Sequence, residues 1–241
     1  MRLRWESAIV WIGAGVAVLA TARLGMWQLD RASQQTALTH EQAQRSQQPV
    51  LTAQQLAQST AEASAQWHRR VVLNGRWLHR HTVFLDNRPL DGRAGFIVVT
   101  PLLIAPGDAV LVQRGWAPRD PQDRTRLPQL PRPEGDVAIV ATIAPVPSRR
   151  LELQGAEAGP IRQNVELATL ERETGAEFRP LSLLETRAPV PDDGLVRSWS
   201  VPAQTVWKHH GYAFQWFALS ALIAGLTVWF RIVRPLRAKR S

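Results

Sequence analysis

The sequence predicts a membrane protein of the α+β class, in which two transmembrane helices form a hairpin and a strand-dominated domain lies between them. Two observations predict this fold. Each end of the 241-residue chain carries a long apolar stretch, and the middle consists of short β-type runs separated by turn residues. The length allows one domain of ordinary size beside the membrane segments.

The first apolar stretch predicts a transmembrane helix over residues 8–29, preceded by a short tail of residues 1–7. Its apolar core, Ser7 to Ala22, is shorter than a full span. Arg23 can extend its charged end towards the bilayer surface, however, and the apolar run resumes at Leu24. A span of about twenty residues is therefore expected.

A cleaved signal peptide is the alternative for this first stretch. Arg2 and Arg4 precede the apolar core, and Ala20-Thr21-Ala22 has the small-x-small form of a cleavage site. The residue pattern leaves both interpretations open, and both place the segment after residue 30 outside the cytoplasm.

The second apolar stretch runs for twenty residues without a charge, from Gly211 to Phe230. As a helix it covers roughly 30 Å, about the thickness of a bilayer core. Aromatic residues gather at both of its ends, as is typical of the two membrane interfaces. We expect a transmembrane helix over residues 209–230 and a basic tail over residues 231–241.

The formal net charge of +9 lies mostly in the two ends of the chain, next to the apolar stretches. Basic residues beside membrane helices set their orientation, so both termini are expected in the cytoplasm and residues 30–208 in the periplasm. This distribution favours the lipid bilayer as a partner and argues against nucleic acid.

The expected periplasmic segment begins with a helical neck at residues 30–48, which lack Gly and Pro. It continues with a β-rich core over about 67–207. A proline-rich loop is expected at 118–133, and Glu166–Thr174 favours a short helix. Arg197–Trp207 is expected to return to the membrane as a strand. At least five strands are predicted, in the runs RRVVLNGRWL, HTVFLDNRP, GFIVVTPLLI, AVLVQRGWAP and DVAIVATIAP.

The composition excludes several kinds of chemistry. The chain has no cysteine, which removes disulfides, thiol redox chemistry and thiolate metal sites, and its two methionines exclude a methionine-rich copper surface. His79 and His81 would share one face of a strand and could chelate a metal, but no third ligand is nearby in the sequence. Common enzyme motifs are absent from the sequence, and we expect no catalytic activity.

The sequence resembles the surfeit-locus-protein-one family of cytochrome oxidase assembly factors. The resemblance rests on LGMWQLDR, on Gly75 with Trp77, and on LDNRPLDGRAGFIVVTPL, VLVQRGWAP and HHGYAFQWF, in this order and between the two apolar stretches. It implies that the first helix is retained, as half of a hairpin with both termini on one side of the membrane.

The last of these motifs is similar to the family pattern His-x-x-Tyr-Ala-x-x-Trp, which maps onto His209, Tyr212, Ala213 and Trp216. Lys208 stands where the family often has asparagine, and the neighbouring His210 adds a second imidazole. The resemblance implies that bacterial members bind haem a and pass it towards the large oxidase subunit.

The spacing of these residues fits a haem site. At 100 degrees per residue His209, Tyr212 and Trp216 share one helix face, and Trp27 lies at about the same depth on an antiparallel first helix. We expect His209 to be the axial ligand of the haem iron and the three aromatic rings to pack on the macrocycle. The alternative is that the three rings are interfacial anchors only.

The expected function is that of a chaperone in respiratory chain biogenesis at the bacterial inner membrane. It would accept haem a from haem a synthase and assist its insertion into the large subunit of cytochrome c oxidase. A haem-free scaffold for oxidase subunits is the alternative, and a tethered enzyme or sensor is less favoured. The family-like residues of the outer domain serve either local packing or a partner surface: Asn87, Arg88, Arg114, Gly115 and Trp116.

Overall fold

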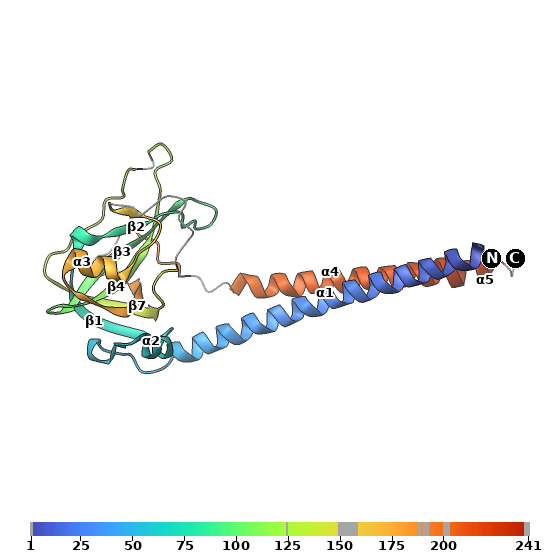
Figure 1. Cartoon of the computed structure of the whole chain (residues 1–241), viewed down its shortest axis with the longest axis horizontal. Helices are drawn as coiled ribbons and strands as arrows, with labels where there is room; N and C mark the ends of the chain where they lie inside the picture. Colours follow the sequence, from blue (N-terminus) through green and yellow to red (C-terminus); the bar gives the residue numbers. More distant parts are fainter. Residues whose placement is uncertain are drawn as a thin grey trace. The chain divides into compact units, whose positions relative to one another are not determined.

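The computed structural model describes residues 2–123, 125–148, 159–187, 189, 193–199 and 203–238. The chain forms two compact units, one of residues 1–41 with 200–241 and one of residues 42–199. In the order of the chain, one helix that is long and apolar enough to cross a membrane precedes the strand-rich unit and another follows it (Figure 1). The predicted membrane α+β fold is confirmed.

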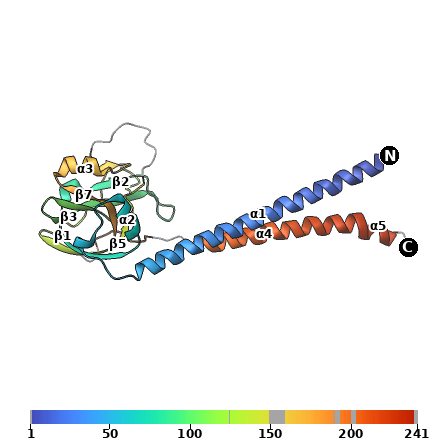
Figure 2. The ribbon, with the colours of Figure 1, turned by 60° about the horizontal axis from the view of Figure 1, so that its bottom comes forward.

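The first unit is built from two long helices. Helix α1 covers Arg2–Ser46 without interruption, and α4 covers Ala203–Val228. A π-helical turn, η3 (Trp229–Val233), and the short helix α5 (Arg234–Ala238) follow α4. Figures 1 and 2 both show α1 and α4 running side by side.

The two candidate membrane spans lie within Ala8–Ser46 and Trp207–Arg237, and only 11% and 6% of their most apolar windows are buried. Their large apolar side chains therefore face outwards, as side chains in contact with lipid do. The borders of the bilayer at residues 8–29 and 209–230 stay predictions.

The described residues of the second unit, called the outer unit below, form seven strands and four short helical segments. All five runs predicted as strands contain one, and Glu166–Thr174 contains the predicted helix. The strands are β1 (Arg70–Trp77), β2 (Val83–Leu85), β3 (Gly95–Ala105), β4 (Asp108–Pro118), β5 (Asp136–Ala144), β6 (Ile161–Arg162) and β7 (Glu177–Arg187). The helical segments are η1 (Ala53–Gln55), α2 (Thr60–Gln66), η2 (His79–His81) and α3 (Leu167–Thr174).

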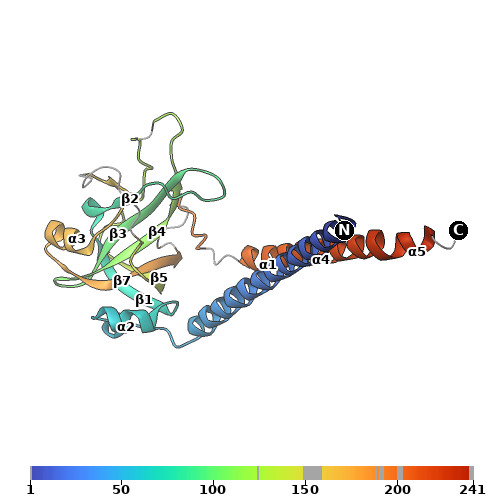
Figure 3. The ribbon, with the colours of Figure 1, turned by 45° about the vertical axis from the view of Figure 1, so that its right-hand side comes forward.

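The sheet closes into a barrel-like ring in the order β1-β5-β7-β4-β3. Closure comes from β1, which pairs with β3 at Arg76↔Leu103 and Trp77↔Leu102. The other half of the same β3 edge pairs with β2, and β6 extends the sheet beyond β2. Figure 3 shows β3 and β4 as the long hairpin of the ring. Its two-residue turn, Pro106-Gly107, suits a tight bend because Gly107 adopts a φ of 75°.

The ring encloses the main core. The strand β1 alternates between exposed and buried residues, as expected when one face points inwards. The strand β4 is buried on both faces, because one face lines the interior and the other lies under β2 and α3 (Figure 2). The core residues contributed by all five ring strands include Val71, Leu73, Leu102, Val110, Val112, Ile139, Ile143, Leu181 and Leu183.

One strand prediction was wrong, and two strands of the described residues, β6 and β7, were missed. Ala203–Trp207 is helical, because α4 starts directly after Pro202 in the sequence and nothing within this stretch breaks a helix. Arg197–Trp199 lies outside the strands, and 200–202 lies outside the described residues. The strand β6 has only two residues, and β7 contains Pro180, which argues against a ladder. The structure accommodates Pro180 at a register shift opposite Ala109–Leu111.

We expect Gly75→Ala to destabilise the outer unit by about 1–3 kcal/mol, because a Cβ at Gly75 would lie 2.5 Å from the carbonyl oxygen of Leu103. Differential scanning calorimetry of the purified protein measures the melting temperature. The control is Asn74→Ala, on the exposed face of the same strand. Equal melting temperatures for the two variants would contradict the close approach.

Candidate functional site

The two long helices meet along a seam of small and polar residues. The less exposed positions of both helices recur at alternating intervals of three and four, the spacing that keeps one stripe of each helix against the other. Small residues on such stripes let two backbones approach closely within a membrane. The seam comprises Ala14, Val18, Thr21, Gly25, Gln28 and Ala32 on α1 and His209, Ala213, Trp216, Ser220 and Thr227 on α4.

Two contacts fix the direction and closeness of the pair. The Ser220 hydroxyl donates to the carbonyl oxygen of Val18 at 3.1 Å. A Cβ on Gly25 would lie 2.8 Å from the Phe217 ring, so any larger residue here would have to displace this ring. Since His209 contacts Gln28 and Ser220 contacts Val18, the helices run antiparallel.

His209 is held by a side chain of the other helix. Its Nδ1 lies 2.7 Å from Oε1 of Gln28, and both residues are half-buried. With the amide oxygen as acceptor, Nδ1 is the donor and carries the proton. The lone pair of the imidazole is then on Nε2, the arrangement that prepares a histidine to bind a metal.

The three aromatic residues predicted for the site differ in their exposure. Trp216 lies in the seam on the same stripe as His209, whereas Tyr212 is 52% exposed. Trp27 is 48% exposed, and the guanidinium of Arg31 lies 5.6 Å from its ring. Because Trp27 precedes Gln28, it is at the level of His209.

Gln28 is the site residue that sequence reasoning missed. Its signal is a single amide in LGMWQLDR, close to the polar end of an apolar stretch. An amide at this place is usually read as an ordinary polar residue of a helix end. Only the register of the seam shows that it meets a histidine.

In the outer unit, Arg114 is central to a buried group of charges. Arg197 bonds Asp193 through Nη1 at 2.9 Å and Glu185 through Nη2 at 2.8 Å. Nη2 of Arg114 lies 3.8 Å from the Asp193 carboxylate, and its guanidinium lies 4.9 Å from the centre of the Trp77 ring. Arg114 occupies a bulge of β4, since Gln113 and Gly115 pair with consecutive residues of β3.

The two carboxylates of this group are affected in opposite directions. Burial raises the pKa of Glu185, although Arg197 and Arg114 oppose the shift. Burial also acts to raise the pKa of Asp193, but hydrogen bonds from Arg197 and from the Leu195 N–H outweigh it and lower that pKa. Asp193 therefore stays ionised to a lower pH than Glu185, because its pKa is lowered and that of Glu185 is raised.

The remaining family-like residues of the outer unit make local packing contacts. Trp116 Nε1 donates to the carbonyl oxygen of Arg88 at 2.7 Å, and the Arg88 side chain donates to the carbonyl oxygen of Ser148 at 3.2 Å. A Cβ on Gly115 would lie 2.7 Å from Leu195. A φ of 56° at Asn87 belongs to the turn that follows β2. These contacts favour the packing interpretation over a partner surface.

His79 and His81 do not share a strand face as expected. They belong to the 3-10 turn η2, in which His79 Nε2 lies 3.0 Å from the carbonyl oxygen of Pro133. Within the described ranges, no three His, Asp or Glu side chains are grouped closely enough to hold a metal ion.

A model of the SURF1 family matches residues 15–221, which is most of the chain and includes parts of both long helices. The chain belongs to the SURF1 family. Among relatives of this SURF1-family protein, a SURF1-like protein of Dictyostelium discoideum is 37% identical over 60 residues, 25% of this chain. The cytochrome oxidase assembly protein SHY1 of Saccharomyces cerevisiae is 28% identical over 149 residues, 57% of this chain. The matches span 22% and 36% of the lengths of these two relatives.

We expect Gly25→Leu to separate the two helices of the SURF1-family protein, because its side chain would enter the space of Phe217. The chain has no cysteine of its own, so the pair Val18→Cys and Ser220→Cys can be oxidised to a single cross-link. Cross-linking should slow several-fold in the Gly25→Leu background. Gly15→Leu is the control, since nothing lies near Gly15. Equal rates in both backgrounds would refute the seam.

The raised pKa of Glu185 predicts a pH-dependent effect of Glu185→Gln. The ordinary pKa of a glutamate is 4.5, and that of Glu185 in the folded protein is higher. At a pH above both values the charged carboxylate is buried and lowers the stability of the fold, whereas a neutral glutamine side chain does not. Protonation removes this cost, so the parent should gain melting temperature relative to Glu185→Gln as the pH falls towards 4.5. Calorimetry over this range tests it, with the exposed Glu177→Gln on β7 as control. A relative loss for the parent would show that the arginines dominate.

Proposed function

We propose that this chain is an assembly factor for haem-copper cytochrome c oxidase that binds haem a at His209 and assists its insertion into the large catalytic subunit. Membership of the SURF1 family and the assembly role in the name of the yeast relative support the oxidase as its target. The observation that carries the haem proposal is the bond between His209 Nδ1 and Gln28 Oε1.

The residues around His209 fit a haem group. Imidazole is a common ligand of haem iron, and the Gln28 contact orients the ring and leaves Nε2 for the iron. The exposed rings of Tyr212 and Trp27 offer apolar surface to a flat macrocycle. Lys208, next to His209, is exposed and can meet propionate groups. Haem a is the cargo here, and its iron supplies the bond to the imidazole.

A cargo that must be handed on requires a site that holds it and then releases it. His209 would supply a ligand to the iron, while Trp216 lies half-buried within the seam on the same stripe. The proposed role is therefore non-catalytic: His209 binds the iron, Gln28 fixes the imidazole, and the two helices keep the macrocycle out of water.

The proposed location is the bacterial inner membrane, with both termini cytoplasmic and the outer unit periplasmic. The antiparallel pairing of α1 and α4 and the basic residues near both chain ends support this topology. It also supports a retained first helix, because Gln28 belongs to α1. Haem a synthase is the proposed donor of the cargo and the large oxidase subunit its acceptor.

The decisive experiment compares His209→Ala with the parent after co-expression with a haem a source. We expect near-stoichiometric haem a in the detergent-purified parent and loss of most of it in His209→Ala, because the axial ligand is removed. Visible absorption and haem extraction measure the content. His210→Ala is the matched control, since this neighbouring imidazole is exposed and has no contact with Gln28.

Each outcome has a definite meaning. Haem loss in His209→Ala alone supports the proposal, and a partial loss in Gln28→Leu would show that the amide positions the ligand. Haem retained in His209→Ala moves the ligand elsewhere. A parent without haem a overturns the carrier role and favours the haem-free scaffold.

A further inference from the structure

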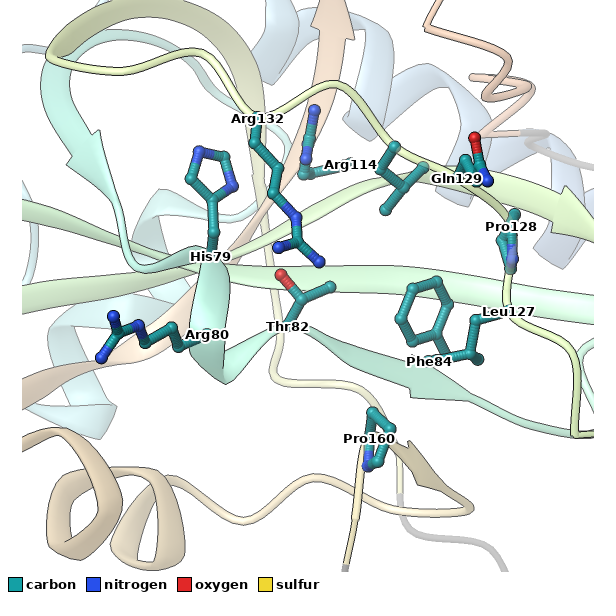
Figure 4. A pocket seen from close by; sticks show the side chains of 11 residues that line it. His79, Arg80, Thr82, Phe84, Arg114, Leu127, Pro128, Gln129, Arg132 and Pro160 are labelled. Atoms are coloured by element: carbon teal, nitrogen blue, oxygen red, sulfur yellow. The ribbon is translucent and has the colours of Figure 1, made fainter.

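The outer unit contains a cavity of about 550 Å³ beside the turn η2. This volume is in the range of small-molecule sites. The turn supplies His79 and Arg80 to the lining, β2 supplies Phe84, and the proline-rich loop contributes residues from the segment 127–132. In Figure 4 the charged side chains stand on one side of the cavity, and Phe84, Leu127 and Pro128 on the other.

The loop over the cavity is held in place. Leu127 and Leu130 pack against the buried cluster that contains Phe84. His79 Nε2 lies 3.0 Å from the carbonyl oxygen of Pro133, which ties the end of the loop to η2. The cavity is thus a formed feature of the fold and not a gap between loosely placed segments.

The cavity lining is basic. Arg80, Arg114 and Arg132 contribute to it, and no carboxylate does among the residues that the structure describes. Within the described part of the chain, Arg80 and Arg132 have no ion-pair partner. Both are exposed, so their charges are available to a ligand at the rim.

The lining residue Arg114, called the floor of the cavity below, has buried N–H donors without acceptors within the described ranges. Arg114 is 1% exposed, and its Nε and Nη2 are buried without a hydrogen-bond partner among the described residues. The nearest carboxylate, Asp193, lies 3.8 Å from Nη2, beyond hydrogen-bond distance. Buried donors are normally satisfied, so this guanidinium indicates a missing acceptor.

We propose that this cavity binds a small anion with an apolar body, such as an aromatic or branched carboxylate. The anionic group would be held by Arg132 and Arg80 near the Arg114 floor, since guanidinium groups bind carboxylates with charge-assisted hydrogen bonds. The apolar body would lie against Phe84 and Leu127, where it loses contact with water. This site is separate from His209 and does not depend on haem binding.

The test uses the full chain in nanodiscs of zwitterionic lipid and equilibrium dialysis against 2-naphthoate. We expect saturable binding of one naphthoate per chain, above that of empty nanodiscs. The neutral 2-naphthamide tests the need for charge, and inorganic phosphate tests the need for an apolar body. Both should bind at least about tenfold more weakly than naphthoate, because the amide lacks the charge and phosphate lacks the apolar body.

The variant Arg80→Gln with Arg132→Gln should weaken naphthoate binding about tenfold or more, because it removes two charge-assisted contacts. Because both side chains are exposed, we expect the double variant to keep the melting temperature of the parent, which shows that it is folded. Arg126→Gln is the matched control, since Arg126 is an exposed arginine of the same loop outside the cavity lining.

Four results would overturn the proposal. They are binding no greater than that of empty nanodiscs, equal binding of the amide, phosphate binding as tight as that of naphthoate, and an equal loss in the Arg126→Gln control. Because naphthoate binding is read without haem, a failure here leaves the result at His209 untouched.

Discussion

The outer unit depends on one close backbone approach, that of β1 to β3. Gly75 has no Cβ, so the strand can pass beside the Leu103 carbonyl and pair with β3 next to β2. With the ring closed, each strand has an inner and an outer face, and the chain must leave the sheet after Trp77 and return at Val83. The turn made in between, η2, presents His79 and Arg80 to the cavity. The same contact that closes the barrel therefore builds one wall of the proposed anion site.

The strands β1 to β5 and the two membrane helices could be predicted from the sequence, because apolar periodicity and turn residues are local signals. Closure of the ring could not, since the pairing of β1 with β3 depends on register between distant residues. The strand β7 was hidden by Pro180, whose missing N–H is tolerated only because the β4–β7 ladder is irregular there. In the site, His209 followed from the family motif, whereas Gln28 depends on a contact 181 residues away in sequence.

The partners of the buried charge on Arg114 could not be predicted from the sequence either. Arg114 could be singled out from its motif, but its neighbours Asp193, Arg197 and Glu185 come from β7 and from the segment after it. A single charge in this interior would be very unfavourable, whereas the group of two arginines and two carboxylates is mutually compensated. At Arg114 the β4 ladder is interrupted by a bulge, so this residue has no pairing partner on β3.

The seam between α1 and α4 uses only a narrow stripe of each helix, and most of their circumference meets lipid. Lipid tails and apolar side chains are alike as surroundings, so replacing lipid by the helices of another protein changes the free energy little. A two-helix anchor of this kind can lie against a larger membrane protein without becoming a permanent subunit of it. The exposed circumference of the two helices therefore leaves room for lateral contact with other membrane helices.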